Sequence, residues 1–270
     1  MTRLAVAPLE FVGERWKATS PAGGSDLDAL HMVTLNTWFD PKHQGVRTRA
    51  LLALLEESDA DIVCLQEVTP TLLEALQADE GIREGAQLVV SASVYGGYGC
   101  AILSQVPIER AWELELPSMM ARSLLAVELM ADDERLVVST VHLESTRSLR
   151  ASRVRQLELI FDALEGAPSA VLVGDFNFDP SEPEEEALDA RYVDLWPLLR
   201  KGEPGYTEDT TRNAMRRKYF GGDKHVRYDR ILIRSTRWRP NEVALFADEP
   251  ITPEVCISDH FGVRARFARS

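Results

Sequence analysis

Residues 124–143, LLAVELMADDERLVVSTVHL, contain two apolar runs joined by a short acidic segment. The runs LLAVEL and LVVSTVHL are rich in residues that favour β-strands. The connecting segment ADDE, at 131–134, is too short for the crossover that parallel neighbours require, so the two strands are expected to pair antiparallel. The sheet is therefore at least partly antiparallel, which disfavours a pure doubly wound fold.

Outside this hairpin, short β-branched runs alternate with helical patterns, which predicts a single α/β domain. Thr69 and Pro70 form an N-cap and first-turn pair, so a helix is expected to begin directly after the strand at 62–66. The linker-like stretch ATSPAGGSD at 18–26 suggests an N-terminal arm, residues 1–30, before a domain at 31–270. Further strands are expected at 31–36, 99–104, 123–130, 170–174, 228–234 and 260–267, and further helices at 46–58 and around 157–164.

The composition excludes several classes of protein. With 270 residues, 45% of them hydrophobic and 27% charged, the chain has the composition of an ordinary globular protein whose core needs no disulfide or structural metal. The net charge of −13 repels polyanions, so any contact with nucleic acid must come from local basic patches.

The cysteines and the N-terminal residues indicate the cellular compartment. Cys64, Cys100 and Cys256 lie far apart in apolar runs, which is typical of core residues, and no Cys/His cluster suggests zinc. The opening MTRLAVAPLEFVGE is too weakly apolar for a signal peptide, and no apolar run approaches the roughly 18 residues of a membrane span. We therefore expect a cytoplasmic protein that does not enter a membrane.

Polar residues that could carry chemistry recur just beyond the predicted strand ends, where sheets present catalytic groups. Each of them alone has an ordinary explanation, because an Asn after a strand is commonly a turn residue and a Glu is commonly a solvated carboxylate. Their recurrence in one domain favours a shared site formed by Asn36, Glu67, His142, Glu144, Asp175, Asn177, Asp229, Asp259 and His260.

The residue types indicate the chemistry. Carboxylates and amides, without cysteine or a paired serine and histidine, favour a hard, oxygen-ligated ion such as Mg²⁺ or Mn²⁺. Two histidines beside them suit a phosphate oxyanion. Such a set could make a water nucleophilic and stabilise the charge of an in-line displacement at phosphorus. Asp175 and Asn177 flank Phe176 with a spacing that puts both side chains on one face if the backbone stays extended.

The chain resembles the endonuclease/exonuclease/phosphatase superfamily, which has the DNase I fold. Six motifs carry this resemblance in order: TLN (34–36), LQEV (65–68), HLES (142–145), GDFN (174–177), RYDRIL (227–232) and SDHFGV (258–263). Within that superfamily the chain looks most like the 5′-tyrosyl-DNA phosphodiesterases, on the segments PSMMARSLL (117–125), HLESTR (142–147), YVDLWPLL (192–199) and RYDRILIR (227–234).

The resemblance implies a four-layer α-β-β-α sandwich of two mixed β-sheets flanked by helices. It also implies a divalent-metal-dependent phosphodiesterase that acts on nucleic-acid ends, and in the tyrosyl-DNA subgroup on tyrosine joined to a DNA 5′ end. Mg²⁺, or Mn²⁺ in its place, would be held by Glu67 with support from Asn36 and Asp259. The implied catalytic residues are Asp175, Asn177, His142, His260, Asp229 and Asn36.

Within this implied set each residue has a role. Asp175 would activate water, Asn177 would position the phosphate, and His142 and His260 would contact phosphate oxygens. Asp229 matches a carboxylate that pairs with the second histidine, because such a carboxylate fixes the imidazole tautomer and favours its protonated form. From the residues alone, His142 could instead be a core histidine, and Asp229 could form a surface ion pair.

Substrate-binding residues are expected near the motifs. Arg122 lies in the segment that resembles the family's DNA-contacting arginine, and Ser145 and Arg147 belong to HLESTR. The arginines at 150–155 and the basic stretch at 212–227 could neutralise further phosphates, or could form a solvated face paired with nearby acids.

Three positions depart from the family pattern. Trp38 stands where an aspartate usually follows Asn36, Glu208 replaces the aromatic residue of YTWDT, and Asp179 replaces an arginine after GDxN. The last two changes remove groups that would stack on or attract DNA. The acidic run at 182–186 is expected to be a solvated loop and helix start.

Three hypotheses follow. The first is a 5′-phosphodiesterase acting on tyrosyl-DNA, in which DNA, as a 5′ end or single strand, is the partner. A second keeps the metal site but takes RNA ends, abasic DNA or a phosphorylated small molecule as substrate. A third is a module that binds nucleic-acid ends without turnover, and the intact Glu67, Asp175, Asn177 and His260 argue against it.

Overall fold

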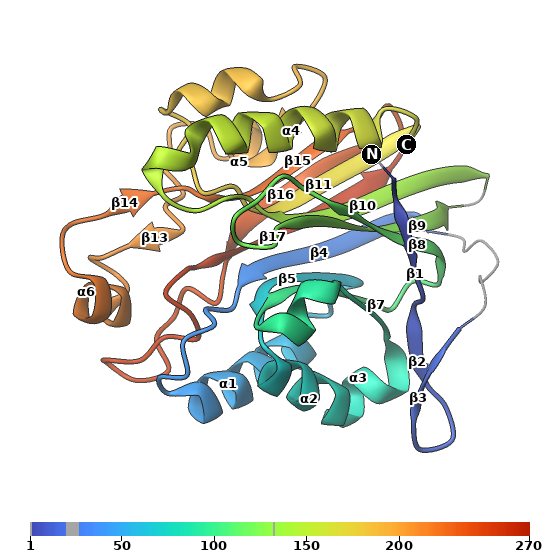
Figure 1. Ribbon diagram of the computed structural model, residues 1–270, viewed down its shortest axis with the longest axis horizontal. Coiled ribbons are helices and arrows are strands. Elements are labelled where there is room, and N and C mark those ends of the chain that lie inside the picture. Colours follow the sequence, from blue (N-terminus) through green and yellow to red (C-terminus); the bar gives the residue numbers. More distant parts are fainter. Residues whose placement is uncertain (1, 20–26, 132) are drawn as a thin grey trace.

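Two β-sheets lie face to face in the computed structural model, which describes residues 2–19, 27–131 and 133–270 (Figure 1). Within these residues, sheet A contains seven strands in the order β1-β8-β9-β10-β11-β15-β12. Their bounds are β1 Leu4–Val6, β8 Ile108–Glu115, β9 Ser123–Ala131, β10 Glu134–His142, β11 Ser169–Asp175, β15 Asp229–Arg234 and β12 Val193–Asp194.

Sheet B contains eight strands over the same described residues, in the order β16-β17-β4-β5-β7-β6-β2-β3. Their bounds are β16 Trp238–Phe246, β17 Gly262–Arg269, β4 Ala29–Asn36, β5 Ile62–Val68, β7 Gly99–Ser104, β6 Gln87–Val90, β2 Leu9–Phe11 and β3 Trp16–Ala18. A separate ribbon pairs β13 Glu208–Asp209 with β14 His225–Val226.

Helices cover the outer face of each sheet (Figure 1). Alternate side chains along a strand point to opposite faces, so Val138 of β10 joins the core between the sheets while Val137 packs under α4. Likewise, Met32 of β4 lies between the sheets and Val33 packs under α1 and α2. The helices are α1 Gln44–Glu57, α2 Pro70–Ala78, α3 Glu80–Gly85, α4 Arg150–Leu164, α5 Leu195–Leu199 and α6 Ala214–Phe220.

This is the predicted four-layer sandwich of two mixed sheets. The hairpin of β9 and β10 pairs antiparallel, as its short connection required, although residue 132 lies outside the described residues. In contrast, β10 pairs parallel with β11, and β4 pairs parallel with β5. The helix expected after β5 begins at Pro70, and the Thr69 hydroxyl accepts a 3.2 Å hydrogen bond from the Leu72 amide.

The N-terminal residues pair with both sheets. Strand β1 pairs with β8 at the edge of sheet A, and β2 pairs with β6 in sheet B. Of the linker-like stretch at 18–26, residues 20–26 lie outside the described residues.

One expectation about exposure is wrong. The run at 182–186 includes a short 3₁₀ helix, Pro183–Ala187, but Glu184 is fully buried rather than solvated. Its carboxylate accepts hydrogen bonds from Arg153, 2.5 and 3.0 Å long, and from Arg150. The chain can bury this charge because two guanidinium groups compensate it.

Two further observations concern the cysteines and the helices. All three cysteines are free and buried, as expected for core residues. Within the described parts of the chain, no helix combines the length and apolar character that crossing a membrane requires.

Candidate active site

Strand pairing brings the predicted residues of sheet A together. In the register of the sheet, His142 at the end of β10 lies opposite Asp175 at the end of β11. Asp175 in turn lies opposite Asp229 at the start of β15. Gly174 makes this pairing possible, because its φ is +130° and an added Cβ would lie 2.0 Å from the carbonyl oxygen of Val141. Three polar side chains therefore lie together at one end of these three neighbouring strands.

Glu67 reaches the site from a bulge in sheet B. The register of β5 against β7 shifts between Leu65 and Val68, and Glu67 within the bulge has a φ of +56°. Such a backbone conformation is strained for a residue with a side chain, and bulges commonly redirect a side chain next to active sites. The Phe39 amide donates to Glu67 Oε2 at 2.8 Å and fixes the redirected carboxylate.

Asn36 connects the two sheets. Its Nδ2 donates to Glu67 Oε1 at 3.1 Å and to Asp175 Oδ2 at 3.0 Å. Its Oδ1 accepts a 3.0 Å hydrogen bond from the Trp38 amide, so the orientation of the side-chain amide follows from its partners. This arrangement favours a role in orienting the carboxylates over the predicted role as a metal ligand. It also shows that the backbone of residue 38 supports Asn36 without an aspartate side chain.

Asp175 and Asn177 share the site through a turn rather than through extended backbone. Strand β11 ends at Asp175, and Asn177 has a φ of +54°. The Asn177 amide donates to Asp175 Oδ1 at 2.8 Å, which is the Asx-turn geometry that Asp and Asn favour. The Asn177 side-chain nitrogen donates to the Leu143 carbonyl at 3.0 Å, which places this amide beside the end of β10.

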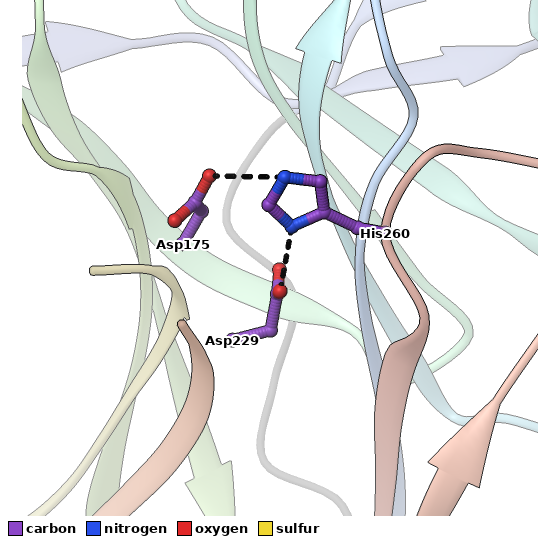
Figure 2. A group of neighbouring side chains, drawn as sticks. All are labelled: Asp175, Asp229 and His260. Carbon is purple, nitrogen blue, oxygen red and sulfur yellow. Dashed lines mark hydrogen bonds and ion pairs between the residues drawn. The ribbon is translucent and has the colours of Figure 1, made fainter. Parts of the chain in front are cut away.

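His260 forms a buried ion pair with Asp229, and Figure 2 shows both beside Asp175. The distance from His260 Nδ1 to Asp229 Oδ2 is 2.8 Å, and Nε2 lies 4.0 Å from Asp175 Oδ2. Burial opposes protonation of the ring, but the surrounding carboxylates, Asp229 first among them, outweigh it and raise the pKa of His260 well above its ordinary value. A protonated ring has no free lone pair for a metal, so the His260 ring suits contact with a phosphate oxygen, while the two carboxylates beside it keep this group of three net negative.

His142 is the neutral counterpart. Burial, together with the positive charge of Arg122, holds the pKa of His142 well below its ordinary value. Arg122 can only donate, so its 2.9 Å contact with His142 Nδ1 leaves the ring proton on Nε2. That nitrogen lies 3.4 Å from Asp175 Oδ2 and 3.8 Å from Glu67 Oε1. The second Arg122 nitrogen donates to Ser145 at 2.9 Å.

The buried carboxylates fit a hard cation. Burial raises the pKa of Glu67, and the nearby charge of Asp175 acts in the same direction. Burial likewise raises the pKa of Asp259 to about 6. Carboxylates crowded in this way are stabilised in their ionised form by a cation, and the oxygen-only donor set suits Mg²⁺ or Mn²⁺ better than zinc.

Arg47 holds the loop that supports this acidic group. It is buried, and it donates to the backbone carbonyls of Thr37, Trp38, Asp40 and Lys42 on one loop. It also donates to the Ile257 carbonyl, two residues before Asp259, at 2.8 Å. Its guanidinium lies 4.6 Å from the centroid of the Trp38 ring. No sequence pattern could have identified this residue, because its hydrogen-bond partners are main-chain carbonyls.

A cleft of about 470 Å³ is lined by Asn177 together with Arg147 and Lys224. Arg147 is exposed and, among the described residues, has no ion pair. Most other arginines and lysines in the two predicted basic stretches are paired with acids, which supports the alternative of a paired face for them: Arg150 and Arg153 with Glu184, Arg155 with Glu158, Arg212 with Asp248, Arg216 and Lys224 with Glu208, Lys218 with Glu254, and Arg227 with Asp194.

Glu208 is the site residue that sequence reasoning missed. The sequence showed it only as the loss of an aromatic residue, but its carboxylate is buried and lies 3.6 Å from His260 Nε2. It accepts hydrogen bonds from Arg216 at 2.5 Å and from Lys224 at 2.7 Å. The charge change at 208, together with the basic residues at 216 and 224, was the available signal.

Comparison with known proteins identifies the family. A family model described as the Endonuclease/Exonuclease/phosphatase family matches residues 33–260. The chain belongs to this family. Members of the endonuclease/exonuclease/phosphatase family are phosphoester hydrolases that depend on a divalent metal.

The individual relatives in the endonuclease/exonuclease/phosphatase family that are compared next share less than 30% of their aligned residues with this chain. Human tyrosyl-DNA phosphodiesterase 2 is 28% identical over 261 residues, which is 90% of this chain and 70% of that protein. The chicken protein of the same name is 29% identical over 234 residues, which is 82% of this chain. The chain spans only 62% of the length of that chicken relative.

Solved structures agree on the fold. The crystal structure of zebrafish (Danio rerio) tyrosyl-DNA phosphodiesterase 2 complexed with single-strand DNA product has a TM-score of 0.79 and 25% identity, and the similarity covers 88% of this chain and 98% of that one. The human Nocturnin catalytic domain with bound sulfate, at 18% identity and a TM-score of 0.69, shares the fold.

Proposed function

We propose that this protein is a Mg²⁺-dependent 5′-phosphodiesterase that releases tyrosine from DNA 5′ ends. One observation carries the proposal: Asn36 donates to both Glu67 and Asp175, at 3.1 and 3.0 Å. A carboxylate suited to a metal and a carboxylate suited to a water molecule are thereby held within reach of one phosphate group.

The phosphate would bind between the two histidines. The protonated His260 offers Nε2 as a charged donor, and the neutral His142 offers Nε2 as an uncharged one. Donors fixed in advance stabilise charge as it develops, because they need no reorganisation during the reaction. Asn177, whose side chain is held at the end of β10, is the third phosphate-binding residue of the proposal.

The reaction would be an in-line displacement. Water forms the new bond to phosphorus, its proton passes to Asp175, and the bond from phosphorus to the tyrosine oxygen breaks. Tyrosine can depart as phenolate because the phenol pKa is only about 10. When bound, Mg²⁺ held by Glu67 and Asp259 would polarise a phosphoryl oxygen and offset its developing charge.

The substrate assignment rests on the relatives. The human, chicken and zebrafish relatives are named for tyrosyl-DNA, and the zebrafish structure contains a single-strand DNA product. The cleft beside Asn177, with the unpaired Arg147 on its wall, offers a path for one strand. Three buried free thiols are compatible with a reducing compartment, so we place the protein in the cytoplasm.

A substrate panel tests this function. It would contain a 5′-tyrosyl oligonucleotide, abasic duplex DNA, 3′-tailed RNA and an inositol phosphate, each assayed with Mg²⁺ and with EDTA. We expect Mg²⁺-dependent release of tyrosine to exceed turnover of the other three by at least tenfold in kcat/KM. Preferential turnover of another substrate would retain the metal site and replace the substrate, whereas no turnover of any would indicate a binding module.

A further inference from the structure

The cleft lined by Asn177 is also lined by Lys224, a cation that the proposed reaction does not use. Lys224 lines this cleft together with Arg147, His225 and Tyr228. Its volume of about 470 Å³ lies within the rough range of 300–1,000 Å³ typical of small-ligand sites. A strand whose first phosphate lies beside Asn177 and His260 would therefore pass Lys224.

The Lys224 side chain is held in one place. Its Nζ donates to Glu208 Oε1 at 2.7 Å and lies 4.5 Å from the centroid of the Tyr228 ring. Its backbone amide donates to the Thr210 hydroxyl and its carbonyl accepts from the Thr210 amide, which extends the pairing of β13 with β14 by one residue. The side chain is still 30% exposed, so its ammonium can reach a ligand in the cleft.

The charges around Glu208 do not cancel. One carboxylate is shared by Arg216 and Lys224, so this group of three carries one surplus positive charge. His260 and Asp229 offset each other as an ion pair. Asp179 and Glu182 also line the cleft and keep their negative charges, and their carboxylates accept hydrogen bonds from backbone amides.

We propose that Lys224, held by Glu208, binds the second phosphate of the strand, the one that follows the scissile phosphate. This inference rests on the proposed function and extends it, because it makes the protein selective for an oligonucleotide over a single nucleotide or a small phosphoester. The contact is to the backbone, so it carries no sequence preference.

The first experiment measures binding without turnover. A single-stranded (dT)₈ with a 5′-phosphate and a 3′-fluorophore is titrated into the Asp175→Asn protein in EDTA, at several salt concentrations. The slope of log K against log[salt] is about 0.7 per phosphate contact for a single strand. We expect Lys224→Gln to reduce the magnitude of the slope by about 0.7, and Lys224→Arg to restore it. The exposed Lys201→Gln variant is the matched control and keeps the original slope.

A slope unchanged by Lys224→Gln, in a protein with unaltered melting temperature, would overturn the assignment and leave Lys224 as a structural partner of Glu208. The second experiment compares kcat/KM for the 4-nitrophenyl ester of thymidine 5′-phosphate with that of the corresponding dinucleotide. The wild-type preference for the dinucleotide is expected to fall about tenfold in Lys224→Gln. If the wild-type protein hydrolyses neither ester, the proposed function fails, and the binding slope still decides the role of Lys224.

Discussion

Arg122 donates a 2.9 Å hydrogen bond to Nδ1 of His142 and so determines which ring nitrogen carries the proton. The same guanidinium donates to Ser145 and lies 5.4 Å from the centroid of the Tyr98 ring. A residue predicted from the sequence to contact DNA thus holds the histidine that we propose to bind phosphate. Orienting partners of this kind keep an imidazole in the tautomer that the chemistry requires.

We expect Arg122→Gln to lower kcat by about 10- to 100-fold, a loss typical of residues that orient a catalytic or metal-binding group. The physical reason is that His142 could then place its proton on either nitrogen. Kinetics on tyrosyl-DNA and ¹⁵N shifts of the His142 ring would measure the effect. Arg110→Gln, an exposed change on β8, is the control. An equal effect of the two variants would remove Arg122 from the site.

Loss of either central carboxylate is expected to abolish turnover without unfolding the protein. Asp175→Asn removes the proposed proton acceptor, and Glu67→Gln removes a charge that is proposed to bind the metal. Both changes keep the shape of the side chain, so hydrogen bonds to Asn36 can be partly retained. Rates should fall at least about 10³-fold, and circular dichroism and melting should stay close to wild type. Asp162→Asn, an exposed change on α4, serves as the control. Retained activity in either variant contradicts the assigned role.

A divalent metal should stabilise the protein through the same carboxylates. A ligand that binds only the folded state stabilises it by about 2.7 kcal/mol at one hundred times its Kd. Melting curves in EDTA, Mg²⁺ and Mn²⁺ should therefore shift upward with the metals. The shift should be lost in Glu67→Gln and in Asp259→Asn but kept in Glu158→Gln, an exposed change on α4. A shift that survives in Asp259→Asn would place the ion elsewhere.

The sequence was sufficient where structure is encoded locally. The turn length between β9 and β10 dictated antiparallel pairing, and the Thr69 and Pro70 pair marked the start of α2 correctly. The motif series located the residues at strand ends because each motif contains both the strand and the polar residue that follows it. Their convergence depends on two sheets packing face to face, which the family resemblance supplied.

The sequence was insufficient where a side chain depends on distant partners. Glu184 belongs to an acidic run, and only the approach of α4 explains its burial beside Arg153. In the sequence, Glu208 is visible only as the loss of an aromatic residue. Its ion pair with Arg216 forms only because the fold brings β13 and α6 together. The pairing of β1 with sheet A was likewise invisible, because edge strands of three residues carry almost no periodic signal.

Gly174 is expected to tolerate no side chain. Gly174→Ala should destabilise the protein by about 2–4 kcal/mol, because an alanine is strained at a φ of +130° and its Cβ would meet the Val141 carbonyl. Chemical denaturation would measure the change. Gly166→Ala is the matched control, since nothing lies within 4 Å of its added Cβ. Similar free energies of unfolding for the two variants would show that β10 and β11 can move apart at Gly174 without a loss of stability.

The buried pair of Arg153 and Glu184 should matter for stability and for substrate binding together. Arg153 also donates to the carbonyls of Glu144 and Thr146, so it holds the loop that carries Ser145 and Arg147. Removing one partner, as in Glu184→Gln or Arg153→Met, should cost about 3–5 kcal/mol because the other charge remains buried. The double variant Arg153→Met/Glu184→Met should lose less than the sum of the two single losses.

The same pair sets a pH dependence of stability. Burial alone would raise the pKa of Glu184, but hydrogen bonds and charge from Arg153 outweigh it, so its pKa lies below the ordinary value. The contribution of Glu184 is therefore present above the unfolded-state pKa of about 4.3 and is lost as pH falls through the lower folded-state value. Wild type should consequently lose stability between pH 5 and 3 (roughly) more steeply than the double Met variant. Urea titrations across that interval would measure the free energy of unfolding of both proteins against pH. Parallel curves for the two proteins would mean that Glu184 has the same pKa in the folded and unfolded chains. That result would contradict the lowered folded-state pKa of Glu184.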